Sequence, residues 1–386
     1  MPAPPATRFP LGAVSMLGLA TIAAYGAWYY AFGVLLDPLL TETGWPEGAV
    51  SATFALSAAA GGLGALPAGR LLDRVGARPV FLLAAGISVV ALWAASTAGS
   101  PVVFVLSGGV GGAALAALGF YHVTQTTAVR VAPDRPARAI SLVTIYGAFA
   151  STIYLPLAAF LVARTDWRTT LRILATITAA VLVAAAIVVR ERERPRRSTS
   201  ALDSGLAFGR AEVRRYVVST ALVGVAVGVV LVYQVPIMTS AGLPVGTAAW
   251  LAGARGAAQL LGRVPLPWVV ARLGPRTSLR LAFAAITAGI VALSASGQVV
   301  FGIVYVVLAG IGVGATSPLQ GIYANDLFDR RVLGAAMGAV TMVFGLATAV
   351  GPLAVGVISE AGADRSAGVA LAAVSAGAAT ALLRRP

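Results

Sequence analysis

Long apolar runs separated by short polar connections make up almost the whole chain of 386 residues. The runs are about 20 residues long, the length that an α-helix needs to cross a hydrocarbon core of roughly 30 Å. Their apolar positions are continuous rather than alternating, which favours helices over barrel strands. We count twelve runs, at 11–36, 47–69, 79–97, 101–129, 139–163, 169–189, 215–239, 245–268, 278–296, 300–325, 333–357 and 366–383. The pattern predicts an all-α membrane protein with twelve transmembrane helices.

The charged residues define an orientation. Only 11% of the residues are charged, yet the net charge is +14. In a soluble protein this balance would suggest nucleic acid, but here most arginines lie in both tails and in the even-numbered connections. Arg164, Arg168 and Arg172, near the third odd-numbered connection, are the exception. The positive-inside rule predicts a multi-pass protein of the cytoplasmic (inner) membrane with both termini cytoplasmic, and no nucleic-acid partner.

Residue usage argues against several kinds of chemistry. The chain has no cysteine and one histidine, so neither a disulfide framework nor a usual zinc site is expected. No glycine-rich phosphate loop follows a strand, and no serine has the partners of a hydrolase nucleophile. We expect neither an enzyme nor a cofactor.

One polar interval divides the chain near its middle. RERERPRRSTSALDSGLAFGRAEVRR, residues 190–215, reads as a cytoplasmic linker between two bundles of six helices. We therefore predict an N-terminal bundle at 1–189, a linker at 190–214 and a C-terminal bundle at 215–386.

The two halves show weak internal similarity. Equivalent glycines lie 198 residues apart, as expected of parallel repeats related by an axis along the membrane normal. The pairs are Gly76 with Gly274 and Gly147 with Gly345, and a similar offset pairs Pro156 with Pro352.

The connection GRLLDRVGARPV, residues 69–80, carries a motif. It resembles the loop between helices 2 and 3 of the major facilitator superfamily, and the residues in register are Gly69, Asp73, Arg74, Gly76 and Arg78. The alternative is an ordinary positively charged cytoplasmic loop. The resemblance implies a conformational latch that breaks as the two bundles rock against each other.

Three further segments narrow the resemblance. YYAFGVLLDPLLTETGWPEGAVSATFALS (29–57), DWRTTLRILA (166–175) and GPLAVGVISEA (351–361) are similar to the monocarboxylate and oxalate/formate branch of that superfamily. Helix 5 lacks the glycine-proline-glycine signature of drug/proton antiporters. The chain contains no lysine, whereas carboxylate transporters of this superfamily carry a membrane lysine in helix 1 or helix 11. The resemblance implies transport of a small carboxylate.

Arg255 is the most unusual residue of the apolar runs. In AAWLAGARGAAQLLGR, residues 248–263, it lies near the middle of the eighth run, where an arginine costs at least roughly 2.5 kcal/mol to insert. No acid lies in the central third of any run. The guanidinium suits a carboxylate and cannot lose its proton, so we expect a substrate-anion site. The alternative is a packing arginine satisfied by carbonyls and water. Gln259 shares its face one turn later, and Arg263 is expected to snorkel.

His122, the only histidine, lies near the cytoplasmic end of the fourth run. It is a candidate proton carrier or substrate ligand, and a packing histidine is an equal alternative. The offset of 198 pairs it with Gln320 in the tenth run, so both are predicted to line the substrate path. Further lining candidates are the aromatic residues Tyr25, Tyr146 and Tyr233.

These observations favour a secondary transporter that moves a small, carboxylate-bearing solute by alternating access. A single buried cation favours a monoanion over a dianion. Protons or a counter-anion are the candidate coupling species, and we expect a monomer in the lipid bilayer. Two alternatives stay open: an efflux transporter of drugs or secondary metabolites, and an anion-binding membrane sensor that does not transport.

Overall fold

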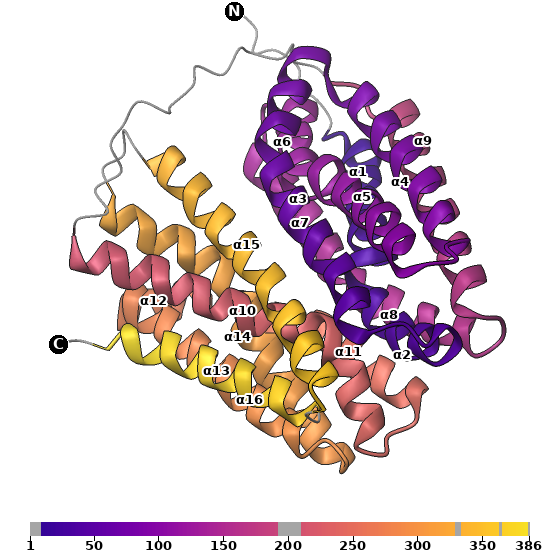
Figure 1. Cartoon of the computed structure of the whole chain (residues 1–386). Coiled ribbons are helices and arrows are strands. Elements are labelled where there is room, and N and C mark those ends of the chain that lie inside the picture. Colours follow the sequence, from indigo (N-terminus) through magenta and orange to yellow (C-terminus); the bar gives the residue numbers. More distant parts are fainter. Residues whose placement is uncertain (1–8, 192–209, 329–332, 363–364, 385–386) are drawn as a thin grey trace, which may run out of the picture.

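The structure, a computed structural model, describes residues 9–191, 210–328, 333–362 and 365–384. Helices dominate these residues and fall into two groups (Figure 1). The first group comprises α1 (Leu11–Tyr25), the π-helix η1 (Gly26–Tyr30), α2 (Phe32–Thr43), α3 (Glu47–Val75), α4 (Ala77–Ser96), α5 (Pro101–Gly119), α6 (Tyr121–Val131), α7 (Pro136–Ala148), α8 (Ala150–Val162) and α9 (Trp167–Val188). The second comprises α10 (Ala211–Ser240), α11 (Val245–Arg263), α12 (Leu266–Leu273), α13 (Pro275–Ser294), α14 (Val299–Leu327), α15 (Leu333–Glu360) and α16 (Ser366–Leu382).

The twelve predicted runs correspond to these helices, and the all-α membrane fold is confirmed. Ten spans in the described residues are long and apolar enough to cross a membrane. The other two runs correspond to α11, which carries two arginines, and to α16, which has 17 residues. Since α9 ends at Val188 and α10 begins at Ala211, the proposed division into 1–189, 190–214 and 215–386 stays a prediction; residues 192–209 lie outside the described residues.

Some spans are broken where the sequence predicted one continuous helix. In the first span, the N–H of Ala31 donates to the carbonyl of Gly26 at 3.1 Å, an i→i+5 bond that defines the π-turn. Gly26 fits there because a Cβ at this position would overlap the ring of Tyr154. In the fourth span, Phe120 is extended, with φ −79° and ψ −179°, and separates α5 from α6. The breaks change which side chains face the neighbouring half.

The internal repeat is visible in the backbone of the connections. Gly76 and Gly274 precede α4 and α13 with φ of +79° and +76°, and each N–H closes the preceding helix. Gly44 and Gly242, also 198 residues apart, both have positive φ. Such backbone conformations favour glycine, so the offset seen in the sequence reflects equivalent turns in the two halves.

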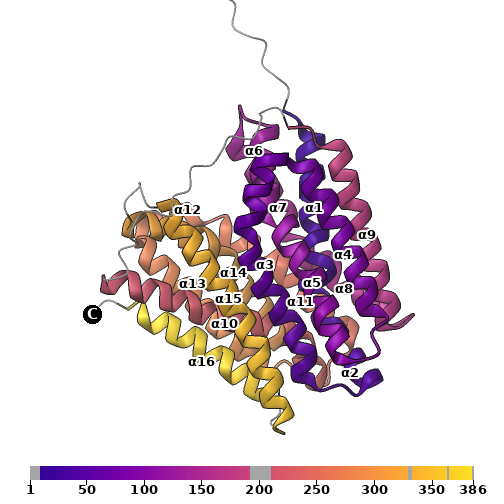
Figure 2. The same ribbon diagram turned by 45° about the horizontal axis from the view of Figure 1, so that its top comes forward.

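The two groups of helices meet at one end and diverge toward the other (Figures 1 and 2). Where α3 begins and α15 ends, the carboxylate of Glu360 accepts from the N–H of Gly48 at 2.6 Å. Nearby, the hydroxyls of Ser51 and Tyr233 lie 2.7 Å apart. We call this the closed end, and the opposite end of α3, which carries residues 69–78, the motif end. Polar contacts between the halves thus tie them together at the closed end.

Candidate functional site

Arg255 lies inside the second half, on α11, with only 1% of its surface exposed. Its Nε donates to the side-chain oxygen of Gln234 on α10 at 3.1 Å. The hydroxyl of Tyr305 on α14 donates to the same oxygen at 2.6 Å. Three helices therefore converge on one guanidinium and fix its position.

The donors of this group are not all satisfied. Nη2 of Arg255 and Nε2 of Gln234 are buried and have no hydrogen-bond partner. In the described part of the chain, no carboxylate forms an ion pair with Arg255. A buried donor left unpaired costs about 1–3 kcal/mol, and more when it is charged. The arrangement leaves N–H groups available to an anion.

Gln259 and Arg263 continue along the same face of α11. Nε of Arg263 donates to the carbonyl of Gly314 at 3.1 Å, and Nη2 lies 3.5 Å from the side-chain oxygen of Gln259. Nη1 of Arg263 is buried without a hydrogen-bond partner. We call Arg255, Gln259 and Arg263 the arginine ladder. Arg263 thus belongs to the same polar face as Arg255, whereas the sequence predicted that it would snorkel.

Aromatic rings of the first half form a second cluster. The ring of Tyr25 stacks on that of Phe120 at 3.7 Å and lies 5.2 Å from that of Tyr121. The rings of Tyr29 and Tyr30 are 5.3 Å apart, edge to face. All four tyrosines are half-buried. We call these five residues the tyrosine cluster; η1 and the break at Phe120 bring them together.

The arginine ladder and the tyrosine cluster face each other between the halves. The hydroxyl of Tyr30 lies beside the side chain of Gln259 and within electrostatic range of both arginines. The hydroxyl of Tyr121 lies beside the guanidinium of Arg263. A ligand held by the ladder would therefore contact both halves.

The structure separates the predicted lining residues into two sets. Arg255 and Gln259 lie in the arginine ladder, and Tyr25 lies in the tyrosine cluster. The other four make contacts elsewhere: Tyr233 with Ser51 at the closed end, Tyr146 with Gly18 in the first half, the Gln320 amide with Thr220 at 3.4 Å, and the exposed His122 with the carbonyl of Ala117 at 2.7 Å. In this conformation none of these four contacts the ladder's arginines.

Sequence reasoning missed Phe120, Tyr30 and Tyr305. In the sequence, Tyr305 is typical of an aromatic residue that packs within an apolar helix, and no residue near it in the chain indicates a polar partner. With a helical period of 3.6, Tyr25 and Tyr29 share a face and Tyr30 lies off it. The glycine at position 26 was the available signal for an irregular turn.

One motif residue, Asp73, belongs to an ionic cluster within the first half. Asp73 pairs with Arg130 of α6, and Arg130 also contacts Glu191 at 3.1 Å. The second oxygen of Glu191 accepts from the N–H of Ala77 at 3.0 Å, directly after Gly76. Gly69 is half-buried, whereas Arg74 and Arg78 are exposed. The cluster joins the ends of α3, α6 and α9 at the motif end.

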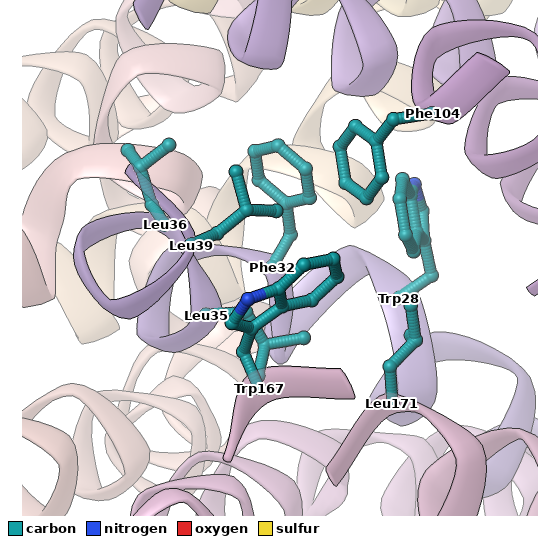
Figure 3. A pocket seen from close by; sticks show the side chains of 8 residues that line it. All are labelled: Trp28, Phe32, Leu35, Leu36, Leu39, Phe104, Trp167 and Leu171. Carbon is teal, nitrogen blue, oxygen red and sulfur yellow. The ribbon is translucent and has the colours of Figure 1, made fainter. Parts of the chain in front are cut away.

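A small pocket lies near the closed end of the first half (Figure 3). Its free volume is about 10 Å³, room for about one water molecule. The lining side chains are apolar or aromatic: Trp28, Phe32, Leu35, Leu36, Leu39, Phe104, Trp167 and Leu171. Trp28 directs its indole N–H to Ser57, at 2.9 Å. With no charged group in its lining, this pocket is unsuited to an anion.

Two bundles with an internal repeat and a polar site between them define the architecture of a secondary transporter, not of an enzyme. The sequence agrees: it matches the Major Facilitator Superfamily over residues 17–233 and 216–386, and the chain belongs to that family. No curated protein sequence matches it.

Solved structures share the fold at low sequence identity. The nucleoside transporter NupG is 14% identical with a TM-score of 0.77, covering 96% of this chain and 97% of its own. A bacterial homologue of the human lysosomal transporter Spinster, inward-facing and unoccupied, is 14% identical with a TM-score of 0.69, covering 98% and 95%. A D-xylose-proton symporter, also 14% identical at 0.69, covers 95% and 97%. These likenesses concern the fold alone.

Proposed function

We propose that this major facilitator protein transports a small organic anion of the monocarboxylate kind across the cytoplasmic membrane. The observation that carries the proposal is Arg255, a buried cation with an unpaired Nη2 and no ion pair among the described residues. An arginine that cannot deprotonate needs a negative partner in a bilayer. A substrate carboxylate supplies that partner during part of the cycle.

Alternating access follows from where the substrate would bind. An anion on the arginine ladder also meets Tyr30 and Tyr121 of the other half, and so draws the two bundles together. The contact is made only when both halves are in place, which gives occluded and open states different affinities. We assign the motif end, with both termini, to the cytoplasm because Arg70, Arg74 and Arg78 lie at that end of α3 and α4.

The test is a counterflow screen with purified protein in proteoliposomes. Labelled monocarboxylates and dicarboxylates are the anionic probes, and uridine and xylose are the neutral probes suggested by the structural neighbours. We expect carboxylate counterflow in the native protein. Because removal of a charged hydrogen-bond partner costs roughly 1.5–3 kcal/mol, Arg255→Gln should reduce carboxylate transport about 10- to 100-fold. Arg255→Lys should fall between, since lysine keeps the charge and loses the fork.

The matched control is Arg272→Gln, because Arg272 is an exposed arginine stacked 4.1 Å over the ring of Trp268. It should transport at the native rate. Native carboxylate rates in both Arg255 variants would refute the anion site. Binding without counterflow would instead identify a sensor, and transport of neutral probes or drugs alone would favour the other classes of transporter.

The same assay tests whether transport is coupled to protons. His122 remains our candidate proton carrier, because it is the only histidine and is exposed beside the broken fourth span. If it carries the coupled proton, His122→Gln flattens the dependence of uptake on pH. An unaltered pH profile excludes that role and leaves exchange with a counter-anion as the coupling mechanism.

For the motif residues Gly69, Asp73, Arg74, Gly76 and Arg78, we propose a latch that re-forms when the motif end closes.

A further inference from the structure

We infer that Arg263 forms a second carboxylate subsite, so that two carboxylate groups are held along the arginine ladder at once. This inference rests on the proposed function, because it takes Arg255 as the first subsite. It departs from the expectation of a single buried cation, since the structure places a second guanidinium on the same face.

The two guanidinium groups are prepared in the same way. Each is anchored by its Nε to a neutral oxygen, Arg255 to the Gln234 side chain and Arg263 to the Gly314 carbonyl. Each then keeps one buried Nη without a hydrogen-bond partner. Anchoring by Nε fixes the orientation and leaves the terminal nitrogens to a ligand, which is the geometry for binding a planar carboxylate.

Snorkelling does not explain the position of Arg263. A snorkelling side chain extends toward the lipid headgroups, but this guanidinium is held back by Gly314 and by the hydroxyl of Tyr121 in the other half. Gly314 packs against the backbone of Gln259, where a Cβ at position 314 would come within 2.7 Å of the Gln259 carbonyl carbon. Close packing of α11 on α14 therefore holds the Arg263 guanidinium beside Gly314 and next to the first half.

Charge balance then requires two negative groups. In the described residues no ion pair reaches Arg255 or Arg263, and the partners they do have, amides, carbonyls and hydroxyls, are neutral. Two uncompensated arginines in one bilayer site each cost at least roughly 2.5 kcal/mol. One carboxylate would leave one of them unpaired. Two carboxylates would neutralise both.

The spacing of the ladder limits how the carboxylates are supplied. Eight residues separate the two arginines, about 12 Å along the helix axis at 1.5 Å per residue. Between them, Gln259 and the hydroxyl of Tyr30 present a neutral polar surface. A dicarboxylate with an aliphatic spacer fits if its length matches the separation of the two anchored guanidinium groups, and two monocarboxylates fit one at each guanidinium. Both possibilities present carboxylate groups to the two arginines, and experiment distinguishes one dicarboxylate from two monocarboxylates.

The experiment compares butyrate with succinate and glutarate on purified protein, measuring binding stoichiometry by calorimetry and half-saturation by counterflow. If both carboxylates belong to one molecule, a dicarboxylate is preferred over butyrate at least about tenfold in the native protein. If they come from two molecules, two butyrates bind per chain. In either case Arg263→Gln removes the second interaction and retains one carboxylate at Arg255, while Arg272→Gln changes nothing.

The inference is overturned if native protein binds one butyrate and shows no dicarboxylate preference, or if Arg263→Gln matches native protein in both measurements. Arg263→Lys keeps the charge, and partial recovery with it separates loss of the subsite from loss of folding. Failure of the proposed function looks different, because native carboxylate transport by Arg255→Gln would refute both ideas. Loss of transport in Arg255→Gln with an unchanged Arg263→Gln refutes the second subsite alone.

Discussion

At Tyr30 one hydroxyl links the first half of the molecule to the arginine ladder of the second. It lies beside the Gln259 side chain and in the field of both arginines. Tyr30→Phe removes that hydroxyl and keeps the ring, so we expect carboxylate affinity to fall about 3- to 10-fold, the cost of losing one net polar contact of roughly 0.5–1.5 kcal/mol. Half-saturation of counterflow measures it. Tyr29→Phe is the matched control, since the Tyr29 hydroxyl lies in the field of Arg255 and not beside Gln259; equal losses in both variants would contradict a specific role for Tyr30.

The same residues show what the sequence could predict. Arg255 and Gln259 were identifiable because a charge in an apolar run is costly and because positions four apart share a helix face. Arg263 was misplaced because depth in a membrane was inferred from distance to the end of the run. His122, Tyr146 and Gln320 have plausible depths, but depth does not determine which neighbour a side chain faces. Contacts between segments far apart in the chain decide that.

Within the first span, the π-turn η1 is the element that assembles the tyrosine cluster. Its extra residue places Tyr25 and Tyr30 on one face, with ring centres 6.3 Å apart. Apolar periodicity predicted the span but not the turn, because the added residue leaves hydropathy unchanged. Gly26 allows the ring of Tyr154 to pack directly on the backbone at this turn.

Gly26→Ala should therefore disturb both stability and function at this element. The added methyl group overlaps Tyr154, so either α8 moves or η1 rearranges, at a cost of about 1–3 kcal/mol typical of overpacking. We expect carboxylate affinity to fall at least about fivefold as the tyrosine cluster shifts. Gly12→Ala is the matched control, because a Cβ at that position, in the first turn of α1, contacts nothing within 4 Å. Native affinity in Gly26→Ala, measured by counterflow, would show that the turn does not position the site.

For the whole molecule, the internal repeat explains why the fold was the most predictable feature. Twelve apolar runs and paired glycines with positive φ require only local information. To predict which end is closed, one must know the contacts between the halves, such as those of Arg365 with Asp37 at 2.6 Å and with Glu47 at 3.5 Å.

The ion pairs of Arg365 also shift its pKa. Burial lowers the pKa of Arg365, but its hydrogen bond and charge interaction with Asp37 and Glu47 outweigh burial and leave the pKa raised. A raised pKa keeps Arg365 charged at all physiological pH values, and the stability that this charge contributes would be lost as the pH rises through that pKa.

Opening of the closed end must break these ion pairs, so Arg365→Ala should shift the conformational balance. A half-buried pair is worth about 1 kcal/mol, and its loss should raise the population open at this end roughly fivefold. The chain has no cysteine, so spin labels at Thr41→Cys and Ala361→Cys, exposed on opposite halves, report the separation directly. Arg164→Ala is the control, because Arg164 is exposed nearby and stacks on Phe160 of its own half. Identical distance distributions in Arg365→Ala and in this control would mean that the close packing of α3 on α15, rather than the ion pairs, holds the end closed.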